Sequence, residues 1–416
     1  MKISYRYPNV DPLHRKYTIL LAFLPILNVY AFSFMKGLSL GMIVASIFAV
    51  FGVVKLFFNI KLYSKAIIPL SLLMTWIAFG SVGFLVPSEI GFDISLYIYS
   101  VLKLAVWGVI IISMSSSYFR PDIFVDVLVK VAIFSTSYLI FQAFMTYILG
   151  LSISNGFDLG IISANYTDYY YEQDLNAGQI RLASVWFEPA QYAAYIILAC
   201  ICILFKNDQL IENRLLKFSF LSFGLILSTS SAAIFWLFII ITTWAVWRKY
   251  VGVIFLVIFF SAIFYFSLNA EELLNQLRMQ GVLGYSIYLA ITKIEHWEDS
   301  ARLGASFKTA FAILEYGAYK FSGIGIGSEN ILMNKLGLEL LYLNSFSRIF
   351  IWSGFIGVSL YLFFYLYSVF IFRENKLSVL LLTYCFISGF YSTMWTSPES
   401  ILYYSMAFYS GRCRIA

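Results

Sequence analysis

The chain has 416 residues, of which 61% are hydrophobic and only 12% are charged. A soluble domain carries roughly twice that charged fraction, so the composition excludes a soluble globular protein. The net charge of +6 comes from basic residues spread over the short segments between apolar runs, which does not indicate a nucleic-acid partner.

Apolar runs of membrane-spanning length recur from one end of the chain to the other. They predict an all-α polytopic membrane protein that forms a single integral membrane domain over residues 1–416. The predicted helices are 17–35, 38–58, 66–86, 94–115, 123–149, 186–205, 215–229, 231–247, 251–268, 346–372, 377–395 and 399–411. The seventh and eighth runs are equally compatible with one bent helix, which would reverse the orientation of every later helix.

The distribution of Lys and Arg predicts the orientation. With the N-terminus in the cytoplasm, seventeen basic residues fall in inside segments and only Lys36 falls in a short outside loop. This asymmetry is the one expected of a correct topology. It favours two separate helices at 215–229 and 231–247, and it predicts that both termini are cytoplasmic.

Two outside segments are longer than connectors, at about 150–185 and about 269–345. The first contains the acidic, tyrosine-rich stretch ANYTDYYYEQD, which suits sugar stacking and equally suits a lid at the aromatic belt of a membrane. The second contains a predicted helix with one apolar stripe, which would lie on the membrane surface or cap the bundle. The stripe consists of Leu303, Phe307, Phe311 (or Ala310), Leu314 and Ala318, with Asp299 or Ser300 as N-cap.

Charged and polar residues stand where the sixth helix is expected to begin, in RLASVWFEPAQY. Pro189 has no N–H and is best tolerated at the first position of a helix, so this helix should start at Glu188 or Pro189. Arg181 and Ser184 precede Glu188 on the approach, and Tyr192 follows one turn later. A salt bridge or interface anchor is the plain interpretation of Arg181 and Glu188, and a site at the mouth of the bundle is the functional one.

The spacing R-x-x-S-x-x-x-E-P, at the end of a long outer loop, resembles a signature of Wzy-type polysaccharide polymerases, the O-antigen polymerases. The layout of many helices and two large outer loops is also similar to that family. Further short elements carry the resemblance in the second loop and beyond it: Ser300-Ala301-Arg302, GIGIGSEN at 323–330, Leu343-Asn344-Ser345-Phe346 and Gly354-Phe355-Ile356-Gly357.

The resemblance implies a GT-C-like, metal-independent, inverting glycosyltransferase of the bacterial inner membrane that needs no cofactor. Its substrate would be an oligosaccharide repeat unit on undecaprenyl pyrophosphate, and its active site would face the periplasm with access to membrane lipid. A chain-length regulator and a flippase of the same pathway would be its partners. Two rivals stay open: an O-antigen ligase, and a flippase or other transporter of lipid-linked oligosaccharides.

The expected site residues follow from the reaction. Glu188, assisted by Arg181, is the candidate catalytic base. In the related ligases a histidine commonly stands near the end of the second loop, where this chain has Asn344, so His296 is kept as the alternative base. Because negative charge develops on the leaving pyrophosphate, we expect bidentate cationic donors to stabilise it. The candidate binding residues are Arg278, Arg302, Arg348, Ser184, Asn344 and Tyr192.

Two sets of charges fall within the predicted helices. Asp126 and Lys130 are four residues apart and should pair with each other. Lys103 stands near the middle of the fourth helix, where an isolated charge is costly, and the sequence assigns it no role.

Overall fold

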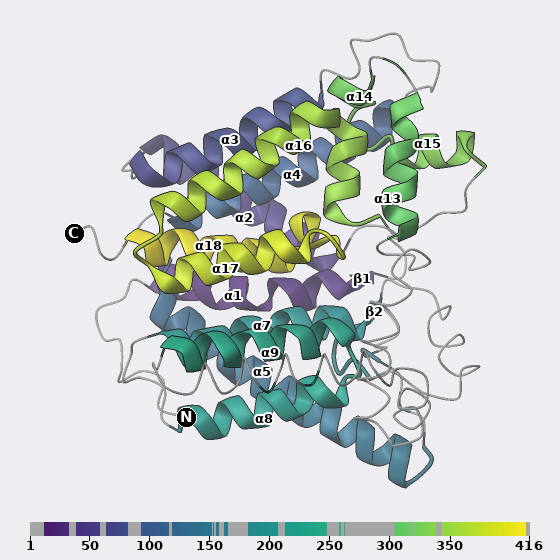
Figure 1. Cartoon of the computed structure of the whole chain (residues 1–416). Helices are drawn as coiled ribbons and strands as arrows, with labels where there is room; N and C mark the ends of the chain where they lie inside the picture. The colour runs from purple at the N-terminus through teal and green to yellow at the C-terminus, as the bar shows by residue number, and fades with distance from the viewer. Residues whose placement is uncertain are drawn as a thin grey trace. The chain divides into compact units, whose positions relative to one another are not determined.

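The computed structural model describes residues 12–32, 39–58, 64–81, 93–115, 119–151, 153, 155–157, 162–164, 182–206, 213–247, 258, 262, 304–315, 317, 319–337 and 343–412. These residues are helical apart from two short strands, turns and connecting segments (Figure 1). The chain divides into two compact units. Unit 1 comprises Met1–Leu24, Met42–Ile123 and His296–Ala416, and unit 2 comprises Pro25–Gly41 and Phe124–Glu295.

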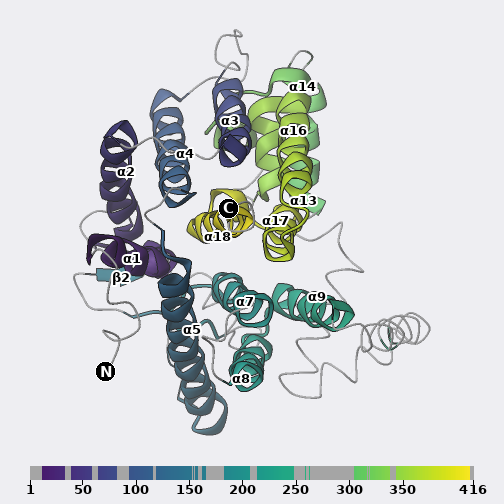
Figure 2. The ribbon, with the colours of Figure 1, turned by 90° about the vertical axis from the view of Figure 1, so that its left-hand side faces the viewer.

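Unit 1 holds most of the helices. They are the first part of α1 (Pro12–Val29), α2 (Leu40–Phe58), α3 (Ser64–Gly80), α4 (Ile94–Ser115), α13 (Gly304–Phe311), the 3-10 helix η3 (Ala312–Glu315), α14 (Tyr319–Ser322), α15 (Glu329–Lys335), α16 (Ser345–Ile371), α17 (Lys376–Ser388), the 3-10 helix η4 (Met394–Thr396) and α18 (Pro398–Arg412). Within this unit α16 packs on α3, and α18 packs on both α4 and α17 (Figure 2).

An aromatic core joins these helices of unit 1. The ring centroids of Trp76 and Trp395 are 4.9 Å apart, and those of Trp395 and Tyr361 are 4.4 Å apart. All three side chains are buried. The Trp76 indole N–H donates to Ser353 Oγ at 2.9 Å, so its one polar group is satisfied inside the core.

Unit 2 is built around α7 (Pro189–Phe205), which packs against α8 (Arg214–Leu227) and α9 (Ser231–Trp247). It also contains most of α5 (Pro121–Ala143), which continues as a π-helix, η2 (Phe144–Ile148). The strands β1 (Tyr30–Phe32) and β2 (Ile162–Ala164) form an antiparallel pair in which Tyr30 lies opposite Ala164. Most of α7 is fully buried, as its uninterrupted apolar sequence predicts.

The all-α prediction is confirmed for the described residues, and their helices are of the apolar kind that associates with membranes. Within the described part of the chain, three stretches are long and apolar enough to cross a bilayer, at residues 94–113, 121–148 and 345–371, and five shorter helices are also apolar. Of the expected helix at 251–268 only residues 258 and 262 are described, and both are helical. The number of twelve spans stays a prediction.

The connection between α8 and α9 resolves the alternative left by the sequence. Ser228, Thr229 and Ser230 separate the two helices, and Thr229 has a left-handed backbone with a φ of 53°. An α-helix does not continue through that conformation. The chain therefore forms two helices here, as the charge distribution favoured.

Several predicted helix ends are wrong, among them that of the third helix, which was expected at residue 86 and lies at Gly80 of α3. Two others show the reason. The first helix was expected to run to residue 35, but α1 ends at Val29 and the chain continues as β1, whose backbone groups pair with β2. The eleventh was expected to run to residue 395, but α17 ends at Ser388, where Gly389 and a series of turns follow. In both cases the apolar composition continues beyond the helix, and composition alone cannot mark the end.

The α-helix in the second loop is shorter than the predicted apolar stripe. The α-helix ends at Phe311 and tightens into η3, and Phe311 and Leu314 are exposed. The buried face is instead made of small or polar residues, Gly304, Ser306, Thr309 and Ala310. Small side chains let α13 approach α16 closely. The expected N-cap, with Leu303 and Ala318, lies outside the described residues.

Helix α16 is interrupted at Gly354, whose φ of 58° and ψ of −155° are not helical. Figure 1 shows α16 running beside α3, with α14 near one of its ends. The backbone N–H groups of Ile324 and Gly325 donate to the carbonyls of Ile351 and Trp352 at 2.9 and 3.0 Å. These loop donors bind carbonyls near the break, where helical pairing is lost.

Candidate functional site

The segment before α7 is held in place by hydrogen bonds within unit 2. The Ser184 hydroxyl donates to the Ser135 carbonyl at 2.6 Å, and the Ser184 N–H donates to Gln142 Oε1 at 2.9 Å. The Ala183 N–H donates to Asn155 Oδ1 at 2.8 Å. These bonds fix the approach to the helix and support the left-handed backbone of Ser184, whose φ is 60°.

Ser184 and Tyr192, both predicted to bind substrate, are fully buried. The Ser184 hydroxyl is engaged with a backbone carbonyl, and the Tyr192 hydroxyl lies 2.8 Å from Thr136 Oγ1. Both groups therefore stabilise the packing of α5 against α7. The described contacts favour a structural role, and substrate binding by either residue stays a prediction.

Glu188 is the N-cap of α7, and Pro189 occupies the first helical position, as the sequence predicts. Gln191 forms the other half of a capping box, with its Oε1 at 3.5 Å from the Glu188 N–H. Unlike Ser184, Glu188 is partly exposed. Glu188 thus caps a helix at a partly exposed position.

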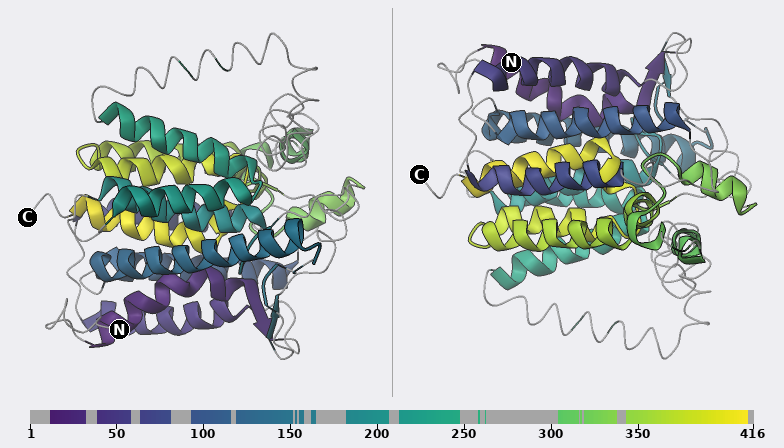
Figure 3. Two further views of the ribbon diagram at one scale, coloured as in Figure 1. Left: turned by 90° about the horizontal axis from the view of Figure 1, so that it is seen from below. Right: turned by 90° about the horizontal axis from the view of Figure 1, so that it is seen from above.

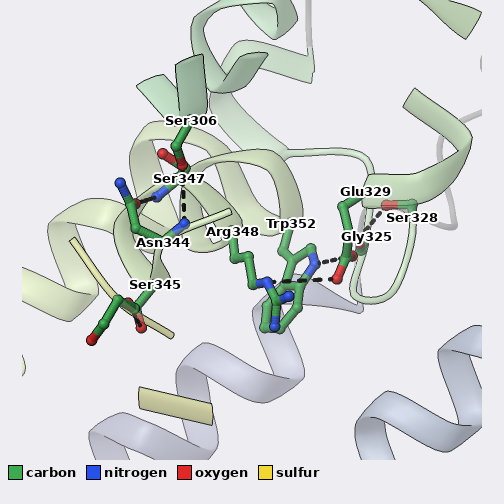
Figure 4. A network of polar contacts seen from close by, with 10 residues as sticks. Ser306, Gly325, Ser328, Glu329, Asn344, Ser345, Ser347, Arg348 and Trp352 are labelled. Atoms are coloured by element: carbon green, nitrogen blue, oxygen red, sulfur yellow. Dashed lines mark hydrogen bonds and ion pairs between the residues drawn. The ribbon is translucent and has the colours of Figure 1, made fainter. Parts of the chain in front are cut away.

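Asn344 is the N-cap of α16, and its side chain accepts from the Ser347 N–H at 2.8 Å (Figure 4). Its own N–H donates to Ser306 Oγ at 3.0 Å, which joins the start of α16 to α13. Asn344 is fully buried. Asn is a favoured N-cap residue because its short side chain reaches the first free N–H groups of a helix. A histidine would serve this cap poorly.

Three polar side chains meet near the break in α16 (Figure 4). Glu329, at the start of α15, accepts from the Trp352 indole N–H at 2.6 Å through Oε2. Its Oε1 lies 4.0 Å from Arg348 Nε, at the outer limit of an ion pair. The side chains of Arg348 and Glu329 are 27% and 14% exposed, so both are largely removed from solvent. A guanidinium in this setting interacts with anions more strongly than one in water.

Two further charges belong to this group. Lys103 of α4 interacts electrostatically with Arg348, Glu329 and Glu399, and Glu399 is a buried residue of the first turn of α18. We call Lys103, Glu329, Arg348 and Glu399 the unit 1 charge cluster. Two cations and two carboxylates from four helices balance each other, which lowers the cost of burying them.

The glycine-rich turn before α15 positions Glu329 of this cluster against α16 and α4. Gly323 has a φ of 70°, and a Cβ there would collide with the Trp352 backbone. A Cβ at Gly327 would lie 2.8 Å from the Leu96 carbonyl of α4. Because no larger residue fits, the turn packs directly on α16 and on α4. The glycines thus bring α15, with Glu329 at its start, against both helices.

The remaining predicted site residues, Arg181, Arg278, His296 and Arg302, lie outside the described residues. Arg348 is therefore the one predicted cation that the structure describes. Asp126 and Lys130 form the expected exposed pair, with Lys130 Nζ 2.7 Å from Asp126 Oδ2.

The sequence prediction missed Glu329, Glu399 and Trp352. Glu399 follows Pro398 at the start of α18, in the reverse order of Glu188-Pro189 before α7. The signal available in the sequence is a charged residue at the start of an apolar helix. It marks Glu399 as it marks Glu188. Nothing in the sequence links Lys103 to residues more than two hundred positions later.

No known family profile matches the sequence, and no curated protein matches it.

Proposed function

We propose that this chain is an O-antigen or related polysaccharide polymerase. It would join oligosaccharide repeat units carried on undecaprenyl pyrophosphate at the periplasmic face of the bacterial inner membrane. The chain would be a metal-independent, inverting, GT-C-like glycosyltransferase. The observation that carries the proposal is the unit 1 charge cluster. It holds largely buried cations next to α15, in a chain whose helices are mostly apolar.

In the proposed reaction the acceptor sugar hydroxyl attacks the anomeric carbon of the donor sugar. The bond from that carbon to the pyrophosphate oxygen breaks, and the electron pair leaves with undecaprenyl pyrophosphate. Arg348, with Arg181, Arg278 and Arg302, would stabilise the charge that develops on the leaving group. Glu188 would take the hydroxyl proton, which requires an accessible carboxylate. Its partial exposure at the start of α7 supports that role.

A second candidate is a flippase or other transporter of the same lipid-linked substrate. The break in α16 and the charges of Lys103 and its partners favour it, because transporters bind substrates at discontinuous helices and intramembrane charges. An O-antigen ligase is the third candidate. The lipopolysaccharide of a deletion strain separates the three. A single repeat on core indicates a polymerase, bare core with lipid-linked polymer indicates a ligase, and repeat units trapped inside the cell indicate a flippase.

The role of Glu188 has its own test in the purified protein with a defined lipid-linked repeat unit. Glu188→Gln keeps the size and can still cap the helix, but it cannot take a proton, so we expect a folded protein that makes no polymer. Glu188→Asp should retain a trace of activity. Glu315→Gln, at an exposed carboxylate of η3, is the matched control and should polymerise normally. Polymer of wild-type length from Glu188→Gln would remove the general-base role and leave Glu188 as a cap.

The cations are tested in the same assay. Arg348→Ala, Arg181→Ala and Arg302→Ala should each shorten or abolish polymer, and Lys should rescue only partly because it offers no bidentate fork. Arg373→Ala is the control, because Arg373 stacks on Phe370 with its guanidinium carbon 4.9 Å from the ring centroid. Normal polymer from Arg348→Ala would disconnect the unit 1 charge cluster from catalysis.

A further inference from the structure

Large apolar side chains are exposed where α13, η3 and α14, which we call the loop helices, meet α16. We call them the α13–α16 patch: Phe311 (46% exposed), Leu314 (40%), Phe321 (54%), Phe355 (46%) and Ile356 (39%). Scattered exposed apolar residues are ordinary in any protein, but a contiguous group marks a surface that contacts another apolar medium.

The patch is one surface, because its rings are in contact through Phe350. The ring centroids of Phe311 and Phe350 are 5.7 Å apart, those of Phe350 and Phe355 are 5.1 Å apart, and those of Phe355 and Phe321 are 6.3 Å apart. Helix α14 also lies against the break itself. A Cβ at Gly354 would be 2.5 Å from the Lys320 carbonyl. The loop helices and α16 therefore present their apolar side chains together, at the end of α16 that Figure 3 shows beside α13 and α15.

The patch continues along the second part of α16. Beyond Ile356, the large exposed apolar residues of that helix are Leu362, Phe363, Leu366 and Phe370. Their spacing of three, four and seven residues places them on one face. This helix belongs to a stretch long and apolar enough to cross a bilayer, so acyl chains are the medium that covers the face. The same medium then reaches Phe321 and Phe311.

Cations border the patch on the loop helices. Lys308 is exposed one turn before Phe311, and Lys320 Nζ lies 5.3 Å from the centroid of the Phe321 ring. Aromatic side chains beside lysines are typical of helices that lie at the membrane interface, where the rings enter the acyl region and the ammonium groups meet lipid phosphates.

We infer that α13, η3 and α14 are not a water-exposed loop. They lie in the boundary between the headgroups and the acyl chains of one leaflet, with the α13–α16 patch on the acyl chains and Lys308 and Lys320 at anionic headgroups. The partner is the phospholipid bilayer itself. This inference goes beyond the proposed function and holds for any of the three candidate activities.

The test uses the full-length protein in vesicles of phosphatidylethanolamine and phosphatidylglycerol. An environment-sensitive fluorophore is attached at Phe311→Cys or Phe321→Cys in a Cys413→Ser background, because Cys200, Cys202 and Cys385 are buried. We expect both probes to be quenched by spin-labelled lipid chains and to be protected from iodide in the buffer. A probe at Asn334→Cys, on the exposed side of α15, is the control and should show the opposite pattern.

Iodide quenching at positions 311 and 321 equal to that at 334 would overturn the inference. Protection from both quenchers, with self-quenching between labelled copies, would also overturn it by assigning the patch to a second copy of the chain. Each labelled variant must elute from size exclusion as the wild type does. A probe buried by misfolding would then not be counted.

The headgroup contact is tested separately. Vesicles of phosphatidylcholine replace the anionic lipid, and the variant Lys308→Glu with Lys320→Glu is compared with the wild type. We expect quenching by lipid chains at position 321 to fall at least twofold with either change. Lys130→Glu, which reverses one exposed charge of α5 outside the patch, is the control and should leave the quenching unchanged. Equal quenching for the wild type in anionic vesicles, the wild type in phosphatidylcholine and the double variant would refute the role of the two lysines.

Discussion

Replacing Gly354 by alanine is the sharpest test of the broken α16. At a φ of 58° and a ψ of −155° the backbone is in a region that only glycine occupies readily, and a residue with a Cβ pays about 1–3 kcal/mol there. The new Cβ would also lie 2.5 Å from the carbonyl oxygen of Lys320 and 2.5 Å from the carbonyl carbon of Phe321. These are backbone atoms that cannot rotate away.

Forcing an extra carbon into such packing costs about another 1–3 kcal/mol. We therefore expect Gly354→Ala to lose about 2–6 kcal/mol of stability. For a unit of this size that corresponds to a fall in Tm of roughly 4–24 °C. The assay is thermal unfolding of the detergent-purified protein, followed by the loss of the monodisperse size-exclusion peak.

Gly337→Ala is the matched control. Gly337 also has a positive φ, 64°, but a Cβ there meets no atom within 4 Å. Only the backbone term applies, at about 1 kcal/mol. Equal melting temperatures for the two variants would refute the close contact between α14 and α16, and with it the account of the break. A wild-type Tm for Gly354→Ala would show that α16 is continuous.

Three further predictions concern hydrogen bonds within one unit or the other. Ser184→Ala removes the hydrogen bond to the Ser135 carbonyl and should lower the free energy of unfolding by about 1 kcal/mol; a loss of activity at unchanged stability would restore the predicted binding role. Asn344→Ala should cost about 0.5–2 kcal/mol by uncapping α16, whereas Asn344→Asp should be tolerated because it still accepts from the Ser347 N–H; equal Tm values for the two variants would contradict the cap. Burial raises the pKa of the Tyr30 hydroxyl above its usual value near 10. The bond that the Tyr30 O–H donates to the Val185 carbonyl is therefore intact below that pH and lost as the pH rises through the raised pKa, whereas the Phe157 N–H can still donate to the phenolate. Tyr30→Phe should be less stable at neutral pH and lack this alkaline transition, and an unchanged alkaline unfolding curve would refute the linkage.

The sequence predicts the helices well where the ends of an apolar run coincide with residues that start or stop helices. The expected helix at 231–247 has the bounds of α9, and the expected helix at 346–372 differs from α16 by one residue at each end. The strand β1 could not be predicted, because three residues form a strand only by pairing with β2 far along the chain.

The candidate site is predicted less well than the fold. Glu188 and Pro189 stand where expected, because proline and the N-cap leave a local signal. Asn344 was predicted to bind substrate, although an Asn before an apolar helix is equally a cap signal. The contact between Glu329 and Trp352 depends on the break at Gly354, and the glycine pair at 354 and 357 does not by itself indicate a break.

The break in α16 has a consequence for how the protein is made. Backbone carbonyls cannot enter a bilayer without donors, and those of Ile351 and Trp352 are bound by Ile324 and Gly325. These donors leave the ribosome before the carbonyls do. The glycine-rich turn is therefore already synthesised when α16 reaches the insertion machinery, and a chain with the two segments in the opposite order would expose unpaired carbonyls to lipid. The donors that pair the carbonyls at the break thus precede those carbonyls along the chain.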